Sequence, residues 1–249
     1  RDRHGFQAIG VASFGPLDLD TRSGTYGCVV NTPKPGWSGF DILSRVRCWA
    51  TPVGFDTDVN GAALAEGRWG AGRDLEAFAY VTVGTGIGVG SILNGRPLRG
   101  LGHSEAGHIR ISRPPGSNFS GACPYHGDCV EGLASGPAVL AHAGLPAEQL
   151  SRSDPAWDLV VSALTGLFHN LVLTTAPERI LMGGGLGMGQ PHLLPRIRAA
   201  LLQSLNGYGV ADRLAPRIDE FLIQPALGHR AGPLGALALA IEAAETASR

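Results

Sequence analysis

The sequence predicts an α/β fold, because short apolar segments of strand character alternate with helical segments along the chain. Two of the predicted strands run directly into glycine-rich turns, at residues 84–88 and 183–185, and this repetition indicates two similar halves. The chain has 249 residues, of which 44% are hydrophobic and 16% are charged. This composition is enough for one large core or for two modest ones.

The predicted elements follow from local composition and periodicity. Strands are predicted at 7–14, 52–56, 77–83, 87–93, 179–182 and 221–223, and helices at 59–69, 133–143, 156–175, 192–205 and 233–246. The first helix rests on the strong helix formers from Ala62 to Glu66, and the two strands on either side of the first glycine turn predict a hairpin. Residues 24–40 and 94–131 are rich in glycine, proline and polar residues and are predicted as loops.

Composition also narrows the partners and the compartment. The formal net charge is −1 and the isoelectric point is about 6.8, so nucleic acid and anionic membranes are disfavoured as partners. We find no signal peptide and no apolar run near 18 residues, which favours a cytoplasmic, reducing setting. Cys28 and Cys48 have no partner pattern and are interpreted as small hydrophobes.

Four potential metal ligands gather in one segment. Cys123, His126 and Cys129 follow the spacing C-x2-H-x2-C, and His108 lies fifteen positions before the first of them. Four Cys and His donors with turn residues between them are what a tetrahedral structural zinc site requires. A disulfide between Cys123 and Cys129 is the main alternative.

Several carboxylates stand where ligands are expected to bind. Asp58 lies between a predicted strand and a predicted helix, and α/β proteins bind ligands at the carboxyl ends of strands. Its carboxylate could accept the proton of a substrate hydroxyl, and Asn60 could hydrogen-bond a polyol. The alternative is that Asp58 only caps the helix. Glu105 and Glu131 flank the predicted metal ligands, which indicates that this loop borders a binding site.

The two glycine runs suit close contact with a nucleotide. From Gly84 to Gly90 glycine occupies alternate positions, so backbone N–H groups and the Thr85 hydroxyl could bind an anion. The run matches neither the Walker spacing nor a dinucleotide fingerprint, and a plain hairpin turn is the alternative. The second run, Gly183-Gly184-Gly185, could pack flat against an adenine or ribose, or could form a tight turn.

These motifs, in this order, resemble the ROK family of sugar kinases over essentially the whole chain. The glycine run and the segment Glu105-Ala106-Gly107-His108 are similar to the family signature. The metal loop is more discriminating, because His126 stands where most family kinases have a cysteine, which is the pattern of the fructokinase branch. Residues 13–18 and 32–37 also resemble that branch.

The resemblance implies a two-domain actin-like (ribonuclease H-like) α/β fold with sugar and ATP between the domains and with the N-terminal domain incomplete. It places the remainder of the N-terminal domain at 1–75 and the C-terminal domain at 76–249. The zinc loop then spans 103–131, and the closing helix at 233–246 can pack back on the N-terminal domain.

The resemblance also implies an activity and a set of roles. The activity is ATP-dependent phosphorylation of fructose to fructose 6-phosphate, with magnesium accompanying ATP and a homodimer as the expected assembly. The implied roles are Asp58 as catalytic base, Glu105, His108 and Glu131 in sugar binding, Thr85, Gly86, Gly183, Gly184 and Gly185 in ATP binding, and His108, Cys123, His126 and Cys129 as ligands of a structural zinc ion.

One departure from the family pattern limits these expectations. Family members begin with a strand and a phosphate loop of the type Asp-x-Gly-Gly-Thr-Lys, which this chain lacks. The chain opens at Arg1 without a methionine, so we interpret it as truncated and expect an exposed sheet edge and little kinase activity from it alone. A sugar-sensing regulator of the same family and a non-catalytic sugar binder are alternatives. Glucose, mannose or an N-acylhexosamine could replace fructose.

Overall fold

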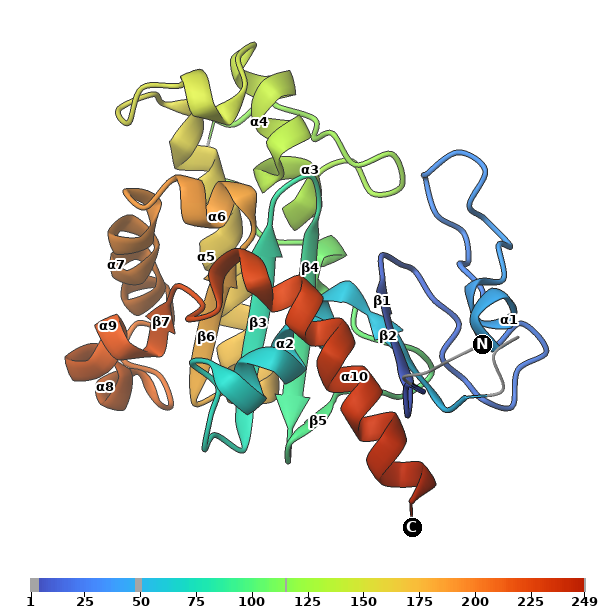
Figure 1. The fold of residues 1–249 in the computed structure, drawn as a ribbon. Coiled ribbons are helices and arrows are strands. Elements are labelled where there is room, and N and C mark those ends of the chain that lie inside the picture. Colours follow the sequence, from blue (N-terminus) through green and yellow to red (C-terminus); the bar gives the residue numbers. More distant parts are fainter. Residues whose placement is uncertain (1–4, 48–50, 115, 249) are drawn as a thin grey trace.

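Two β-sheets organise the chain in the computed structural model, which describes residues 5–47, 51–114 and 116–248 (Figure 1). The strands are β1 (Ile9–Ser13), β2 (Val53–Thr57), β3 (Ala77–Val83), β4 (Ile87–Leu93), β5 (Arg96–Pro97), β6 (Arg179–Gly183) and β7 (Leu222–Ile223). The small sheet pairs β1 with β2 in parallel. The large sheet has the order β5-β4-β3-β6-β7, in which β3 is antiparallel to β4 and parallel to β6.

Helices cover both faces of the large sheet. The long helices are α2 (Asp58–Trp69), α5 (Ala156–Thr175), α7 (Leu193–Leu205) and α10 (Ala231–Ala247). Along β3, Ala79, Val81 and Val83 join a core with α5 and α7, whereas Phe78 and Tyr80 join a core with α2 and α10. A strand that is apolar on both faces is therefore explained by its place between two helical layers.

Helix α10 crosses back onto the small sheet (Figure 1). A Cβ atom at Gly10 would lie 1.7 Å from the carbonyl oxygen of Ala236, and one at Gly54 would lie 2.1 Å from that of Leu239. Glycine at these two strand positions therefore lets the helix backbone approach the sheet. Because α2 and α10 also share a core with β3 and β4, packing crosses residue 75, and the division into two domains stays a prediction.

The chain makes an irregular excursion between β1 and β2. Its own small core contains Leu17, Leu19, Val29, Leu43 and Phe55. Cys28 is buried there as a free thiol, as predicted, whereas Cys48 lies outside the described residues. The small sheet ends at β1 in the described part of the chain, and all five residues of that strand are only half-buried.

The predicted strands and long helices are present with small shifts at their ends. The predicted helix at 133–143 is instead two helices, α3 (Val130–Ala134) and α4 (Gly136–Ala143). Ser135 separates them with an extended backbone, and its side chain accepts a hydrogen bond from the N–H of Ala138, which caps α4. Short helices that we did not predict are α1 (Ile42–Arg47), α6 (Gly185–Gly189), α8 (Ala211–Leu214) and α9 (Ile218–Phe221).

Helix α5 corrects the expectation that the chain has no long apolar run. Its 20 residues are long and apolar enough to cross a membrane by length and composition alone. However, 67% of its most apolar window is buried inside the protein, between α7 and the large sheet. Burial of this kind is typical of a central core helix.

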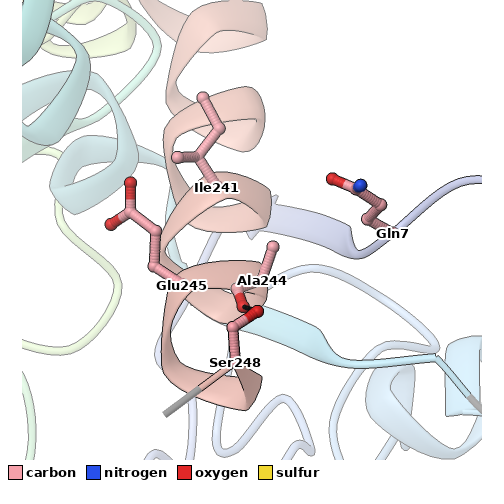
Figure 2. A pocket seen from close by; sticks show the side chains of 5 residues that line it. All are labelled: Gln7, Ile241, Ala244, Glu245 and Ser248. Carbon is pink, nitrogen blue, oxygen red and sulfur yellow. Dashed lines mark hydrogen bonds between the residues drawn. The ribbon is translucent and has the colours of Figure 1, made fainter.

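A hollow of about 470 Å³ lies where the start of β1 faces the last turns of α10. Gln7 lines it from the strand side, and Ile241, Ala244, Glu245 and Ser248 line it from the helix (Figure 2). This hollow lies beside the amino end of β1, and the predicted catalytic residue Asp58 follows the carboxyl end of the neighbouring strand. The hollow is therefore not part of the candidate site.

Candidate functional site

Asp58 begins helix α2 directly after β2 and keeps its carboxylate free of the capping role. Thr57 is the N-cap, because its hydroxyl accepts a hydrogen bond of 3.2 Å from the N–H of Asn60. The alternative interpretation of Asp58 as the cap is therefore wrong. Asp58 Oδ1 accepts the N–H of Val59 at 2.9 Å, and the residue is exposed. Surrounding protein still removes part of its hydration, which raises the pKa of Asp58, while Lys34 acts in the opposite direction.

The neighbouring residues of Asp58 form an ionic cluster around a buried carboxylate, which we did not predict. Asp56 is fully buried, and its carboxylate accepts from Asn60 Nδ2 at 2.8 Å and from Arg99 Nη2 at 2.5 Å. Asn60 is itself 2% exposed, so its amide is held inside the protein and the predicted polyol contact does not fit its position. Arg99 comes from the loop after β5, so this cluster fixes the base of α2 to that loop.

The four predicted metal ligands come together. The donor atoms of His108, Cys123, His126 and Cys129 lie within 4.8 Å of one another. The Sγ atom of Cys123 lies 3.6 Å from Nδ1 of both histidines, and that of Cys129 lies 3.5 Å from Nδ1 of His108. Zinc at about 2.3 Å from sulfur and about 2.0–2.1 Å from nitrogen, with tetrahedral angles, separates such atoms by about 3.5 Å. The donor set therefore fits a zinc ion.

The two cysteines do not form the alternative disulfide. Both Cys123 and Cys129 are free thiols in the structure. Burial raises the pKa of Cys129 to about 11, so a bound metal ion would have to displace its proton. Because the thiols of both cysteines face histidine nitrogens, the four residues are arranged as metal ligands. We call the segment 103–131 that carries them the metal loop.

His108 connects the metal loop to two carboxylates. Its Nδ1 faces the cysteines, and its Nε2 points the other way, 4.0 Å from Glu105 Oε2 and 3.9 Å from Glu131 Oε1. The other oxygen of Glu131 accepts the N–H of Ile87 at 2.9 Å. Glu131 thus ties the metal loop to the start of β4, and a ligand between these groups would meet two carboxylates and one imidazole N–H.

His103 is a site residue that the sequence pattern missed. Its Nε2 accepts a hydrogen bond of 2.9 Å from the backbone N–H of Leu17, which leaves Nδ1 free to face other groups. Nδ1 lies 3.5 Å from Glu105 Oε1. Partial desolvation raises the pKa of Glu105, the two histidines lower it, and the charges of Glu131 and Asp58 raise it further. Glu105 and Glu131 thus meet at His108 Nε2, and Asp58 is near enough to act on the charge of Glu105.

The first glycine run has two functions in the fold. A Cβ atom at Gly88 would lie 2.7 Å from the Val59 side chain, and one at Gly90 would lie 2.5 Å from the Val59 carbonyl oxygen. These two glycines therefore make room for the first turn of α2. Gly86 instead faces Glu131, whose Oε2 would lie 2.8 Å from an added Cβ, and Thr85 is exposed.

The second glycine run lies against the first. Gly184 has φ +84°, a conformation that glycine adopts without strain, and a Cβ there would lie 2.4 Å from the carbonyl oxygen of Val83. A Cβ atom added at Gly84 would lie 3.6 Å from the backbone nitrogen of Gly185. A Cβ atom added at Gly185 would meet no atom within 4 Å. Gly84 and Gly185 thus bring the two runs together at the carboxyl ends of β3 and β6, the edge of the sheet at which α/β proteins bind ligands.

Known proteins share this arrangement over nearly the whole chain. The sequence profile of the ROK family matches residues 1–243. A fructokinase of Zymomonas mobilis is 41% identical over 243 residues, which cover 96% of this chain and 79% of the relative. A fructokinase of Pediococcus pentosaceus is 38% identical over 245 residues, which cover 98% of this chain and 83% of the relative.

A solved structure adds ligands to the comparison. The crystal structure of a ROK family glucokinase from Streptomyces griseus, in complex with glucose and AMPPNP, is 25% identical and matches with a TM-score of 0.74. The match covers 96% of this chain and 83% of that chain. The fold expected from the sequence is therefore confirmed.

Proposed function

The chain belongs to the ROK family, and from this premise we propose that it catalyses the ATP-dependent phosphorylation of fructose to fructose 6-phosphate. One observation carries the proposal: Asp58, Glu105 and Glu131 share a site that borders the glycine hairpin. Three carboxylates suit a neutral polyol better than an anionic substrate, because like charges repel at short range. The two relatives named fructokinase favour fructose over glucose, mannose or an N-acylhexosamine.

Asp58 acts as the general base. It takes the proton from the C6 hydroxyl of fructose while that oxygen attacks the γ-phosphorus of ATP, and ADP leaves. Its raised pKa makes it a better proton acceptor than an ordinary aspartate. Thr57 holds the helix terminus, so the carboxylate can change its protonation state without loss of the cap.

Glu105, Glu131 and His108 bind the sugar. The carboxylates accept hydrogen bonds from hydroxyl groups, and His108 Nε2–H donates one. His103 orients Glu105 from behind, and Ile87 N–H orients Glu131. The two carboxylates are thereby held in place to accept hydrogen bonds from the hydroxyl groups of the sugar.

The two glycine runs bind ATP. Thr85 and Gly86 offer a hydroxyl and backbone N–H groups to the phosphates, and the run Gly183-Gly184-Gly185 packs against adenosine. Magnesium bound with ATP would neutralise charge on the phosphoryl oxygens. The close contact between the runs brings the phosphate end of the nucleotide toward Asp58, whose neighbour Val59 packs on Gly88 and Gly90.

A structural zinc ion held by His108, Cys123, His126 and Cys129 would order the sugar site. Four protein ligands leave no open position, so the ion would not act on the substrate. Through Nδ1 of His108 the ion would fix the ring so that Nε2–H faces Glu105 and Glu131. A homodimer and a cytoplasmic location are part of the proposal on the family resemblance alone.

A coupled ADP-release assay tests the proposal. Fructose, glucose and mannose are compared on the chain itself and on the full open reading frame that encodes it. We expect the highest kcat/KM with fructose in the active form, and zinc at one equivalent per chain by elemental analysis. Sugar binding without ADP release from either form would contradict the kinase assignment and favour a sugar sensor.

A further inference from the structure

Lys34 is the only lysine in the chain, and it lies beside the candidate site. The other nineteen strongly basic residues are all arginines. Lys34 belongs to the segment Thr32-Pro33-Lys34-Pro35-Gly36-Trp37, to which the proposed mechanism assigns no role. The chain therefore has an ammonium group at this one position and guanidinium groups at all its other strongly basic positions. An ammonium and a guanidinium differ in size and geometry.

The backbone register places Lys34 next to Asp58. Ser13 pairs with Thr57 at the carboxyl ends of β1 and β2, so Phe14 and Asp58 are the residues that come directly after this pair. Neighbouring strands lie about 4.8 Å apart. Lys34 Nζ lies 3.4 Å from the centre of the Phe14 ring, as a cation over an aromatic face. The ammonium therefore lies over the residue that follows β1, on the side of the small sheet where Asp58 follows β2, and its charge acts on Asp58.

The Lys34 segment is held in place from both sides. Phe14 also meets Trp37 edge to face at 5.1 Å between ring centres, so the aromatic ring beneath the ammonium is packed. On the other side Tyr125, at the tip of the metal loop, donates a hydrogen bond of 3.0 Å to the carbonyl oxygen of Asn31. The metal loop therefore contacts the segment that carries Lys34.

The charges around Lys34 are those of the proposed sugar site. In the described part of the chain Lys34 forms no ion pair within 4 Å, but the carboxylates that act on it are Asp58 and Glu131. They raise the pKa of Lys34, whereas partial desolvation has a larger effect in the opposite direction. The Phe14 ring occupies one side of the ammonium, and Lys34 is otherwise exposed.

We propose that Lys34 is a substrate-contacting residue whose ammonium donates hydrogen bonds to hydroxyl groups of the bound hexose, opposite Glu105 and Glu131. This inference rests on the proposed function, because it assigns a sugar-binding residue to that site. The carboxylates supply acceptors and Lys34 supplies donors, so the hexose is held from both segments. Arginine would place a planar, longer group over Phe14, and it would not reproduce the contacts.

Chemical protection of the single lysine tests the contact without turnover. The protein is acetylated with an amine-selective reagent, alone, with fructose, and with AMPPNP. Modification is read by mass spectrometry on the arginine-bounded peptide 23–45, which contains Lys34. We expect fructose to slow acetylation of Lys34 at least fivefold and AMPPNP to leave it within twofold. Protection by AMPPNP alone, or by neither ligand, would overturn the proposal.

Steady-state kinetics supply the second test. Lys34→Met should raise the KM for fructose at least tenfold, the loss typical of a charged hydrogen bond, and change the KM for ATP less than threefold. The KM for fructose of Lys34→Arg should lie between those of the wild type and Lys34→Met. Arg22→Met is the matched control, because Arg22 is exposed and pairs with Asp20. An unchanged fructose KM in Lys34→Met would overturn the proposal. Absence of turnover in the wild type would instead contradict the proposed function, and the protection experiment would still decide the role of Lys34.

Discussion

Replacing Asp58 by asparagine separates the proposed chemistry from the stability of the fold. Asparagine retains an oxygen that can accept the N–H of Val59, and the cap of α2 belongs to Thr57. Loss of one negative charge in the first helical turn costs about 0.3–1 kcal/mol. The raised pKa of Asp58 shows that its ionised form is already disfavoured, which offsets part of this cost. We therefore expect the free energy of unfolding to change by less than about 1 kcal/mol.

The effect on turnover should be much larger. Loss of a general base lowers rates by about 10² to 10⁴-fold, which corresponds to about 2.7–5.5 kcal/mol in the activation barrier. The assay is ADP release at saturating fructose and ATP, together with urea unfolding of the same samples.

Thr57→Ala is the matched control for this experiment. It removes the capping hydroxyl and should cost about 1 kcal/mol of stability, with kcat within about threefold of the wild type. The two variants should therefore show opposite patterns. A kcat of Asp58→Asn within about threefold of the wild type would refute the base assignment, as would a loss of stability large enough to explain the lost rate.

Three further predictions concern pH, ATP and the metal loop. Because the pKa of Asp58 is raised above 3.8, acid should protonate the base at a higher pH than usual, so the acid limb of kcat/KM should lie above 3.8 and disappear in Asp58→Asn. Gly184→Ala forces a side chain into positive φ and should cost at least about 1–2 kcal/mol of stability. Gly185→Ala has open space, so it should fold normally and raise only the KM for ATP; equal stability losses would contradict this contrast. Chelation of the metal should lower Tm by about 4–8 °C if it removes about 2 kcal/mol, and should raise the KM for fructose. Zinc should restore both and release protons, because burial raises the pKa of Cys129 to about 11; an unchanged melting curve would contradict a structural role.

Local sequence patterns were sufficient to predict the elements whose residues are near neighbours in the sequence. Helix 156–175 was predicted with the bounds of α5, and the hairpin at 77–93 was predicted with the bounds of β3 and β4. The C-x2-H-x2-C spacing, with His108 fifteen positions before it, likewise predicted the gathering of the four Cys and His donors. In each case the decisive neighbours are close in sequence or repeat with a regular period.

Long-range contacts account for what the sequence could not supply. His103 joins Leu17 from 86 positions away, and no spacing rule connects the two. Asn60 was named as a residue that could hydrogen-bond a polyol, but its amide donates to the buried Asp56, which also pairs with Arg99. The alternate glycines from 84 to 90 predict a backbone open to an anion, but Gly88 and Gly90 instead make room for Val59 in the first turn of α2.

Substrate-dependent ADP release by the wild-type protein and by Asp58→Asn tests the central claim most directly. The account predicts that the active form releases ADP with fructose at a higher kcat/KM than with glucose or mannose, and that Asp58→Asn binds fructose but loses at least about 100-fold in kcat. Binding of fructose by a correctly folded wild-type protein with no ADP release, in the chain and in its full open reading frame, would contradict the account.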